Sequence, residues 1–335
     1  MRIKPNLSDF QIFVCLYRHY GLRSLSLVFL PIGYDPNTVV YRVVMANGMH
    51  YFLKLRSGEV YPPSLLIPRL LIENGIPNIL APLRTLTNEL SCSLVHYSVV
   101  LYPFIQGENA MHKRMTDQQW REFGTTLNAI HSSGLRPEQL PVEDFSLASG
   151  KLVRTIQALV SNTHFESKAA QKCAYFWKDN AEKISRIVAR AEELGKQLQT
   201  MPFEFVLCHS DIHAANIMIT EEGHLFLVDW DSPLLAPRER DLLFIVGSII
   251  AHRVSPQEEE WFFEGYGTTE INRTALAYYR YERAIEDLGE GGRSVFLTTG
   301  QSEAAIAEEA QFTMGLFAPG NIFESALEAD RELGI

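Results

Sequence analysis

The chain has 335 residues, 46% of them hydrophobic, which is enough for a large core or for two lobes. Its net charge of −10 argues against the phosphate backbone of a nucleic acid as the main partner. The longest apolar run, 242–251, is too short to span a bilayer, and residues 1–9 lack the apolar core of a signal peptide. The four cysteines form no CxxC pair, which favours a reducing compartment. We therefore expect a cytoplasmic protein that binds neither membranes nor nucleic acids.

The first hundred residues are predicted to be mainly β-strand. Asn47-Gly48 separates two strand-like segments, so a hairpin with a type I′ turn is expected there. A helix is expected between Pro62 and Asn74, closed by Gly75. Residues 102–107 break the pattern and are interpreted as a hinge. The expected strands cover 25–32, 38–46, 50–55, 79–86 and 93–101.

Beyond this hinge the chain is predicted to be mainly helical. Thr116 and Gln119 form a capping box at the start of a helix that Gly134 ends. Asn272 is expected to cap a helix that reaches about Leu288. One or two helices are expected in 168–199 and two more in 301–333, with one β island at 203–208, 216–220 and 224–230. These patterns predict an α+β protein with a β-rich lobe, 1–104, and a helical lobe, 105–335, around a cleft.

The most informative segment is His209-Ser-Asp-Ile-His-Ala-Ala-Asn216, followed by Asp229-Trp-Asp231. A strand–turn–strand hairpin would place Asn216 opposite Asp229, or one residue away from it. Carboxylate and amide oxygens that meet at a strand end suit Mg²⁺. Phosphoryl transfer needs charge neutralisation, alignment, and a carboxylate that orients or accepts the acceptor's proton. The segment therefore predicts a phosphotransferase.

The same segment resembles the catalytic loop of protein kinases and of the aminoglycoside phosphotransferase and choline kinase family. That family commonly reads His-Gly-Asp-Leu-His-Pro-Gly-Asn where this chain has residues 209–216. Leu227-Val-Asp-Trp-Asp231 resembles its Ile-Asp-Trp-Asp/Glu signature, and 127–131 resembles its Leu-x-x-Leu-His helix. The lack of an Ala-Pro-Glu segment argues against a protein kinase. The resemblance implies a protein-kinase-like bilobal fold and, within the family, a member that modifies aminoglycosides.

The resemblance also implies roles for single residues. Asp211 would be the catalytic base or the carboxylate that orients the acceptor, and Asn216 and Asp229 would hold Mg²⁺. Lys54 would meet the α- and β-phosphates of the donor, with ATP expected and GTP as the alternative. Burying a lone charge in the apolar strand around Lys54 costs several kcal/mol unless an anion partners it. This cost favours the phosphate role over that of a solvated surface lysine.

The remaining nucleotide contacts are expected from weaker signals. The family pairs its strand lysine with a helix glutamate, for which Glu59 is the candidate here, although a surface role fits it equally well. Gly33 is the only glycine of the nucleotide loop, and backbone amides from Gly33 to Thr38 are expected to cover the phosphates. The backbone groups of Tyr102 and Phe104 are expected to pair with a purine edge, unless they are ordinary strand-end residues.

Three further residues are expected to support the catalytic loop. His209 is expected to pin the loop from behind, and Asp241, within an Asp-Leu pair that the family shares, is expected to brace it. His213 has two open interpretations, because it could neutralise the transferring phosphoryl group or make a structural hydrogen bond.

The acceptor is expected to be a small cationic molecule, which carboxylates would bind. The candidate contacts are Asp231, Glu282 and Asp287, with a solvated acidic face as the alternative for each. Choline or another amino alcohol is the alternative to an aminoglycoside as the acceptor.

Two other classes of protein are compatible with parts of the pattern. His-x-Asp-x-His at 209–213 could bind a metal in a hydrolase, but no companion histidine motif exists and Asn216 would then be unexplained. A nucleotide-binding protein without turnover is disfavoured because the lysine, the base and both metal ligands are all present. A small-molecule kinase is therefore the expected function.

Overall fold

The computed structural model describes residues 4–33 and 37–334. The chain divides by its contacts into two compact units, each built from three segments of sequence. Unit 1 contains Met1–Pro141, His209–Leu234 and Trp261–Gly267, and unit 2 contains Val142–Cys208, Leu235–Glu260 and Thr268–Ile335. Residues 105–141 thus share a unit with the first hundred residues, and the lobe boundary at residue 104 stays a prediction. No helix among the described residues is long and apolar enough to cross a membrane.

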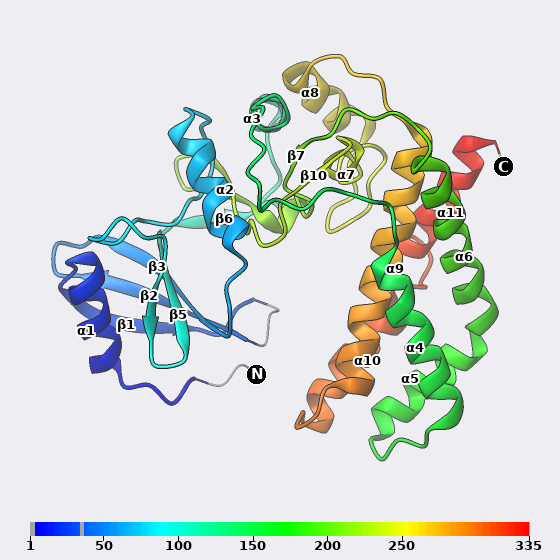
Figure 1. Cartoon of the computed structure of the whole chain (residues 1–335), viewed down its shortest axis with the longest axis horizontal. Coiled ribbons are helices and arrows are strands. Elements are labelled where there is room, and N and C mark those ends of the chain that lie inside the picture. Colours follow the sequence, from blue (N-terminus) through cyan, green and yellow to red (C-terminus); the bar gives the residue numbers. More distant parts are fainter. Residues whose placement is uncertain (1–3, 34–36, 335) are drawn as a thin grey trace. The chain divides into compact units, whose positions relative to one another are not determined.

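A five-stranded antiparallel sheet forms the first part of unit 1 (Figure 1). Alternate side chains of its central strands, such as Leu53 and Leu55, pack against the helix α1. Because side chains alternate between the two faces of a strand, Lys54 lies on the face opposite α1. The strand order is β1-β2-β3-β5-β4, with bounds Ser24–Leu30 for β1, Thr38–Met45 for β2, His50–Ser57 for β3, Cys92–Leu94 for β4 and Tyr97–Pro103 for β5.

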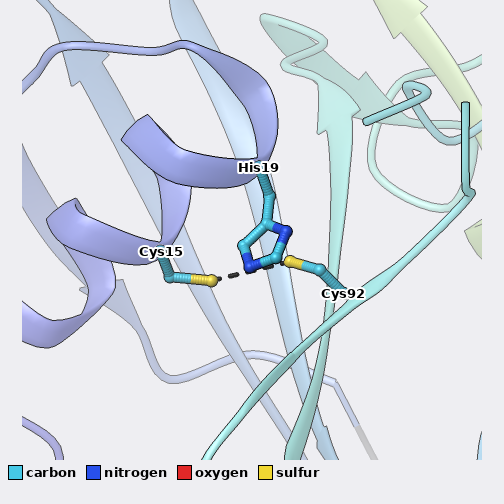
Figure 2. Close-up of side chains that lie close together, drawn as sticks. All are labelled: Cys15, His19 and Cys92. Atoms are coloured by element: carbon cyan, nitrogen blue, oxygen red, sulfur yellow. Dashed lines mark hydrogen bonds between the residues drawn. The ribbon is translucent and has the colours of Figure 1, made fainter. Parts of the chain in front are cut away.

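The helix α1, Asp9–Tyr20, was not expected, because the sequence of the first hundred residues was interpreted as mainly strand with one helix. Ser8 caps it in a capping box with Gln11, and Gly21 ends it in the left-handed conformation. Its buried side chains include Cys15, whose sulfur lies 3.5 Å from that of Cys92 (Figure 2). The expected helix α2 is present as Pro62–Glu73, so this part of the chain holds two helices rather than one.

The hairpin between β2 and β3 is present, but its turn is not of type I′. Gly48 has a positive φ of 82°, whereas Asn47 is not among the residues with positive φ. The Gly48 N–H donates to the Met45 oxygen, and the Met45 N–H donates to the Met49 oxygen. This pattern is a type I turn followed by a glycine bulge, the usual form of a three-residue hairpin loop.

Two strand predictions were wrong. The segment 79–86 makes an isolated bridge between Ile79 and Leu227 of β9 (Leu225–Leu227), and its Leu83 N–H donates to the Leu101 oxygen of β5, so its backbone hydrogen bonds are divided between two sheets and form no continuous ladder. The segment 93–101 is a hairpin rather than one strand, since Val95 adopts a positive φ of 59° and turns β4 back into β5.

The expected β island is divided between two small sheets. β6 (Gly107–Asn109), β8 (Ile217–Thr220) and β9 (Leu225–Leu227) form one, and β7 (Val206–Cys208) pairs with β10 (Leu234–Ala236) in the other. A short 3-10 turn, η1 (Ala214–Asn216), precedes β8.

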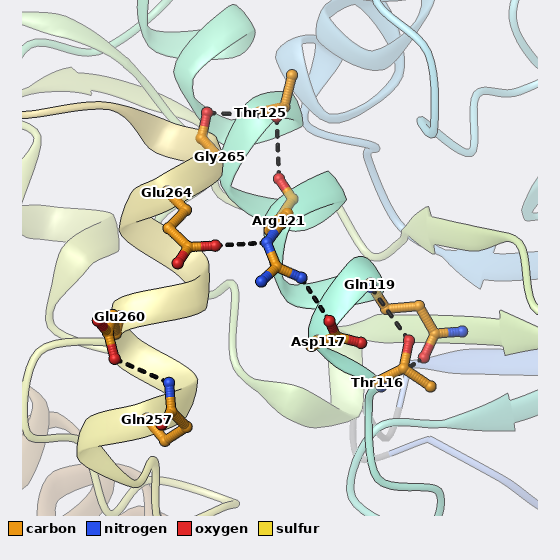
Figure 3. A network of polar contacts seen from close by, with 9 residues as sticks. All are labelled: Thr116, Asp117, Gln119, Arg121, Thr125, Gln257, Glu260, Glu264 and Gly265. Carbon is orange, nitrogen blue, oxygen red and sulfur yellow. Dashed lines mark hydrogen bonds and ion pairs between the residues drawn. The ribbon is translucent and has the colours of Figure 1, made fainter.

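The predicted capping box of Thr116 and Gln119 is confirmed at the start of α3, Asp117–His131. Within unit 1, Arg121 of α3 bonds to Asp117 and to Glu264 of α8, Pro256–Tyr266 (Figure 3).

Unit 2 is a helical assembly around the long helix α9, Arg273–Leu297. Asn272 caps α9 as predicted, but the helix continues nine residues beyond the expected end at Leu288. Its late glycines lie against neighbouring helices, and a Cβ at Gly292 would stand 2.9 Å from Trp177. Tertiary packing therefore overrides the low helix propensity of glycine. The surrounding helices are α4 (Ala148–Asn162), α5 (Lys168–Asp179), α6 (Ala181–Leu198), α7 (Glu239–Leu242), α10 (Glu303–Gly315) and α11 (Ile322–Leu333).

Candidate active site

Lys54 lies in the middle of β3, on the face of the sheet that α1 does not cover. Its Nζ is 2.6 Å from Asp229 Oδ1 and 3.8 Å from Asp231 Oδ1. Burial alone would lower the pKa of Lys54, but the two carboxylates outweigh it and raise the pKa above its usual range. The lysine is therefore a permanent positive charge beside two acidic groups.

Asp229 lies two residues after the end of β9, and its backbone has a positive φ of 64°. Such an angle is uncommon for a residue with a side chain and is held only where the surroundings impose it. The next residue, Trp230, is buried, and its ring lies 4.5 Å from the ring of His209. The buried tryptophan thus anchors the chain while Asp229, 45% exposed, stays accessible.

His209 is fully buried and joins the loop to the end of β9. Its Nε2 lies 3.0 Å from the oxygen of Val228, and its Nδ1 accepts the N–H of Asp211 at 3.3 Å. A neutral imidazole with the proton on Nε2 satisfies both contacts. The ring therefore connects the backbone of Asp211 to the strand that leads into Asp229.

Asp211 itself is 39% exposed and faces two polar side chains. Asn216 donates from Nδ2 to the backbone oxygen of Asp211 at 2.8 Å and to its carboxylate at 3.4 Å. His213 Nε2 lies 3.5 Å from Asp211 Oδ1, while His213 Nδ1 accepts the N–H of Ala215. Because the amide nitrogen of Asn216 is used in this way, its oxygen is the end available to a cation.

The register of the β8–β9 hairpin determines how Asn216 and Asp229 meet. Ile217 pairs with Leu227, and the N–H of Val228 donates to the oxygen of Asn216 at 3.0 Å. Asn216 is therefore opposite Val228, the register one residue away from direct pairing with Asp229. The two residues remain neighbours at the same end of the hairpin.

Comparison with known proteins agrees with this geometry. The family described as "Phosphotransferase enzyme family" (APH) matches residues 28–279, well over half of the chain. The chain belongs to this family. It is similar over its whole length to spectinomycin phosphotransferase APH(9)-Ia, solved with ADP and spectinomycin, with 32% identity, a TM-score of 0.88, and coverage of 98% of this chain and 100% of the other.

Two further relatives are more distant. Protein StrN of Streptomyces griseus is 22% identical over 193 residues, which are 54% of this chain and only 58% of StrN. The choline kinase LicA of Streptococcus pneumoniae is 14% identical with a TM-score of 0.62, over 97% of this chain and 99% of LicA, and shows the fold alone. The phosphotransferase thus has the expected kinase-like fold, with a β-sheet N-terminal part and a helical C-terminal part.

The residues predicted to contact the nucleotide lie in several parts of unit 1 of this phosphotransferase. Gly33 has a positive φ of 91°, while 34–36, the middle of the expected phosphate loop, lie outside the described residues. Tyr102 is the last residue but one of β5 and is in register with Phe52. Phe104 directly follows β5 and lines a cavity of about 480 Å³ together with residues of α2, β8 and β9. These contacts stay predictions.

A helix glutamate does not face the lysine of this phosphotransferase within the described part of the chain. Glu59 is exposed in the connection between β3 and α2, and the recorded ion pairs of Lys54 are with the two aspartates. Glu73, at the end of α2, instead bridges Arg69 and Arg84. The sequence analysis did not predict Asp231 as a second partner of Lys54. Its position two residues after Asp229 could have indicated this contact.

The other predicted acidic residues belong to unit 2, where arginines face them. Glu282 of α9 forms an ion pair with Arg240, and burial raises the pKa of the Glu282 carboxyl to about 7 although Arg240 lowers it. Asp287 lies 3.0 Å from Arg283. Neither carboxylate is part of a solvated face. Asp241 is fully buried at the start of α7.

Proposed function

We propose that this chain is a Mg²⁺-dependent kinase that transfers the γ-phosphate of ATP to a hydroxyl of spectinomycin. The main support is the charged centre of unit 1, where Lys54 pairs with Asp229 and Asp211 lies beside Asn216. The acceptor is inferred from the likeness, over the whole length, to an enzyme solved with ADP and spectinomycin. ATP is a cytoplasmic metabolite, so the cytoplasmic location expected from the sequence is part of this proposal.

The metal would be held by Asn216 and Asp229. A carboxylate and an amide oxygen are hard ligands of the kind that Mg²⁺ prefers, and the amide nitrogen of Asn216 already donates to Asp211. When bound, Mg²⁺ supplies charge neutralisation at the phosphate oxygens of the donor. The residues present therefore fit this ion.

Asp211 would orient the acceptor hydroxyl and take its proton. Its exposure leaves the carboxylate accessible to a substrate, while His209 fixes its backbone and Asn216 its carbonyl. Lys54 would hold the α- and β-phosphates. His213 would stabilise the charge of Asp211 or of the phosphoryl group when its imidazole is protonated.

Asp231, Glu282 and Asp287 stay the proposed contacts of a cationic acceptor. A protonated amine binds a carboxylate through charge-assisted hydrogen bonds worth about 1.5–3 kcal/mol each. Glu282 and Asp287 each face an arginine, which reduces their attraction for a second cation. Asp231 also has a cationic neighbour, since it lies 3.8 Å from Lys54, but its side chain is half exposed whereas those of Glu282 and Asp287 are mostly buried, so Asp231 is the first candidate to test.

The test is nucleotide consumption by the purified chain with one acceptor at a time. Spectinomycin should stimulate ADP release and gain one phosphoryl group by mass spectrometry, whereas choline, ethanolamine and kanamycin should stay at the rate without acceptor. The Asp211→Ala variant provides the control for contaminating kinases. A higher kcat/KM with choline or kanamycin would overturn the spectinomycin assignment and leave family membership intact.

A further inference from the structure

Three side chains that can bind metals meet in unit 1, away from the charged centre. Cys15 and His19 are one helical turn apart on α1, so they share a face of the helix. Cys92 begins β4, the edge strand of the sheet. Figure 2 shows the His19 ring turned toward the two sulfur atoms. The ligand atoms of all three residues lie within 4.8 Å of one another.

The spacing of these atoms distinguishes two kinds of chemistry. Ligands of one tetrahedral zinc ion lie roughly 3.5–3.8 Å apart, given Zn–S and Zn–N bonds of about 2.3 and 2.0 Å. A disulfide requires a separation of about 2.05 Å. The sulfur atoms of Cys15 and Cys92 are 3.5 Å apart, too far for a disulfide and slightly less than the roughly 3.8 Å that separates two thiolate ligands of one zinc ion. His19, the third residue of the cluster, can bind a metal ion through its imidazole, whereas a disulfide between the two cysteines does not need it.

The surroundings of the cluster favour a soft or borderline cation. Cys15 is buried among apolar side chains of the sheet core, where an isolated thiolate is costly. A bound cation would neutralise the thiolate and offset that cost. His19 and Cys92 are partly exposed, which gives an ion access from solvent. Thiolate and imidazole ligands select zinc or copper(I) over magnesium.

We propose that Cys15, His19 and Cys92 bind one zinc ion, with water as the fourth ligand. The ion joins α1 to the edge strand β4. Lys54 lies on the face of the sheet opposite α1, so the zinc site is separate from the charged centre and acts on the stability of unit 1. Binding of an ion only to the folded state raises the free energy of unfolding in proportion to RT ln(1 + [Zn]/Kd).

The test is the metal content of the purified full-length chain after dialysis against zinc, with Co²⁺ as a spectroscopic substitute. The native chain should bind one ion, and Co²⁺ should give sulfur-to-cobalt charge-transfer absorption. Cys15→Ser, His19→Asn and Cys92→Ser should each weaken binding at least tenfold and remove the zinc-dependent rise in Tm. His96→Asn, at an exposed residue of the β4–β5 turn, is the matched control and should bind as the native chain does.

Two outcomes would overturn the proposal. One is equal Co²⁺ binding by the native chain and by His19→Asn, which would show that the histidine is not a ligand. The other is absence of metal together with a Cys15–Cys92 disulfide formed by oxidised glutathione, seen as the loss of two hydrogens in the intact mass. If buried Cys15→Ser fails to fold, the partly exposed positions His19 and Cys92 decide the result.

Discussion

Ser210 and Asp229 both hold positive φ angles, 73° and 64°, at the two turns that flank the hairpin of the active site. Ser210 stands where the family commonly has glycine, and its hydroxyl donates to the oxygen of Ser232 at 2.6 Å. The side chain thus offsets a backbone strain of about 1–2 kcal/mol with a hydrogen bond of about 0.5–1.5 kcal/mol.

This offset predicts different stabilities for two variants of Ser210. Ser210→Ala keeps the strained backbone and loses the hydrogen bond, so it should lower the free energy of unfolding by about 1 kcal/mol. Ser210→Gly also loses the bond but relieves the strain, so it should stay close to the native value. Urea unfolding of the three proteins measures this order, and an alanine variant more stable than the glycine variant would contradict the role of strain.

Asp211→Ala should lower kcat by a factor of about 10² to 10⁴, the usual contribution of a positioned base. Nucleotide affinity should change by no more than a few-fold, because Lys54 and Asp229 remain. Steady-state kinetics with spectinomycin and calorimetry with ATP separate the two effects. A variant that keeps more than about a tenth of the native kcat would show that Asp211 is not the base.

Asp229→Ala should act on the donor instead. It removes the proposed charged metal ligand and the closest partner of Lys54, so the affinity for Mg·ATP should fall strongly. Asn216→Ala should be milder, since a neutral amide contributes less to cation binding than a carboxylate. Calorimetry with and without Mg²⁺ measures both, and unchanged Mg·ATP affinity of Asp229→Ala would refute its assignment as a ligand.

At the scale of elements, α3 and α8 approach each other closely at two glycines of unit 1, beside the network of Figure 3. A Cβ at Gly124 would lie 2.1 Å from the oxygen of Phe262, and one at Gly265 would lie 1.9 Å from the oxygen of Arg121. Both contacts are with backbone atoms, which cannot move aside without shifting a helix.

Gly124→Ala and Gly265→Ala should therefore each destabilise the protein by about 1–3 kcal/mol. Gly315→Ala at the end of α10 is the control, because its Cβ would meet nothing within 4 Å. That change should be neutral or stabilising by up to about 1 kcal/mol. Thermal unfolding of the three variants gives the comparison, and equal destabilisation by all three would refute the packing argument.

Local signals in the sequence predicted the elements that depend on local contacts. The caps at Thr116 and Asn272 mark real helix starts, and the 209–216 segment forms the polar loop before β8. The capping box at Ser8 was an equally good signal for α1, yet no helix was predicted there, because the first hundred residues were interpreted as mainly strand.

The elements that depend on distant partners were not predictable in this way. Residues 79–86 have strand-like composition, but their backbone hydrogen bonds are divided between Leu227 of β9 and Leu101 of β5 and form no continuous ladder. The extension of α9 depends on neighbouring helices that accommodate its glycines. A solvated face stayed open as the alternative for Glu282 because its partner Arg240 lies 42 residues away in the sequence.

For the whole molecule, a further prediction follows from the way unit 1 is built from three separate segments of sequence. A fragment of residues 1–141 lacks β8, the partner of β6, and both carboxylates that face Lys54. It should unfold with lower cooperativity than the full chain and show no Mg·ATP binding. Circular dichroism on heating and calorimetry test this, and a fragment that binds Mg·ATP like the full chain would refute it.

The same discontinuity has a consequence for synthesis on the ribosome. Residues 142–208 lie between the first and the second segment of unit 1, so the ribosome must translate them before it makes the second segment. At roughly 5–20 residues per second, this delays the second segment by several seconds. During that time β6 has an unpaired edge and Lys54 has no acidic partner. The nascent sheet is then exposed to aggregation, so the yield of active protein should depend on translation speed and on chaperones that cover strand edges.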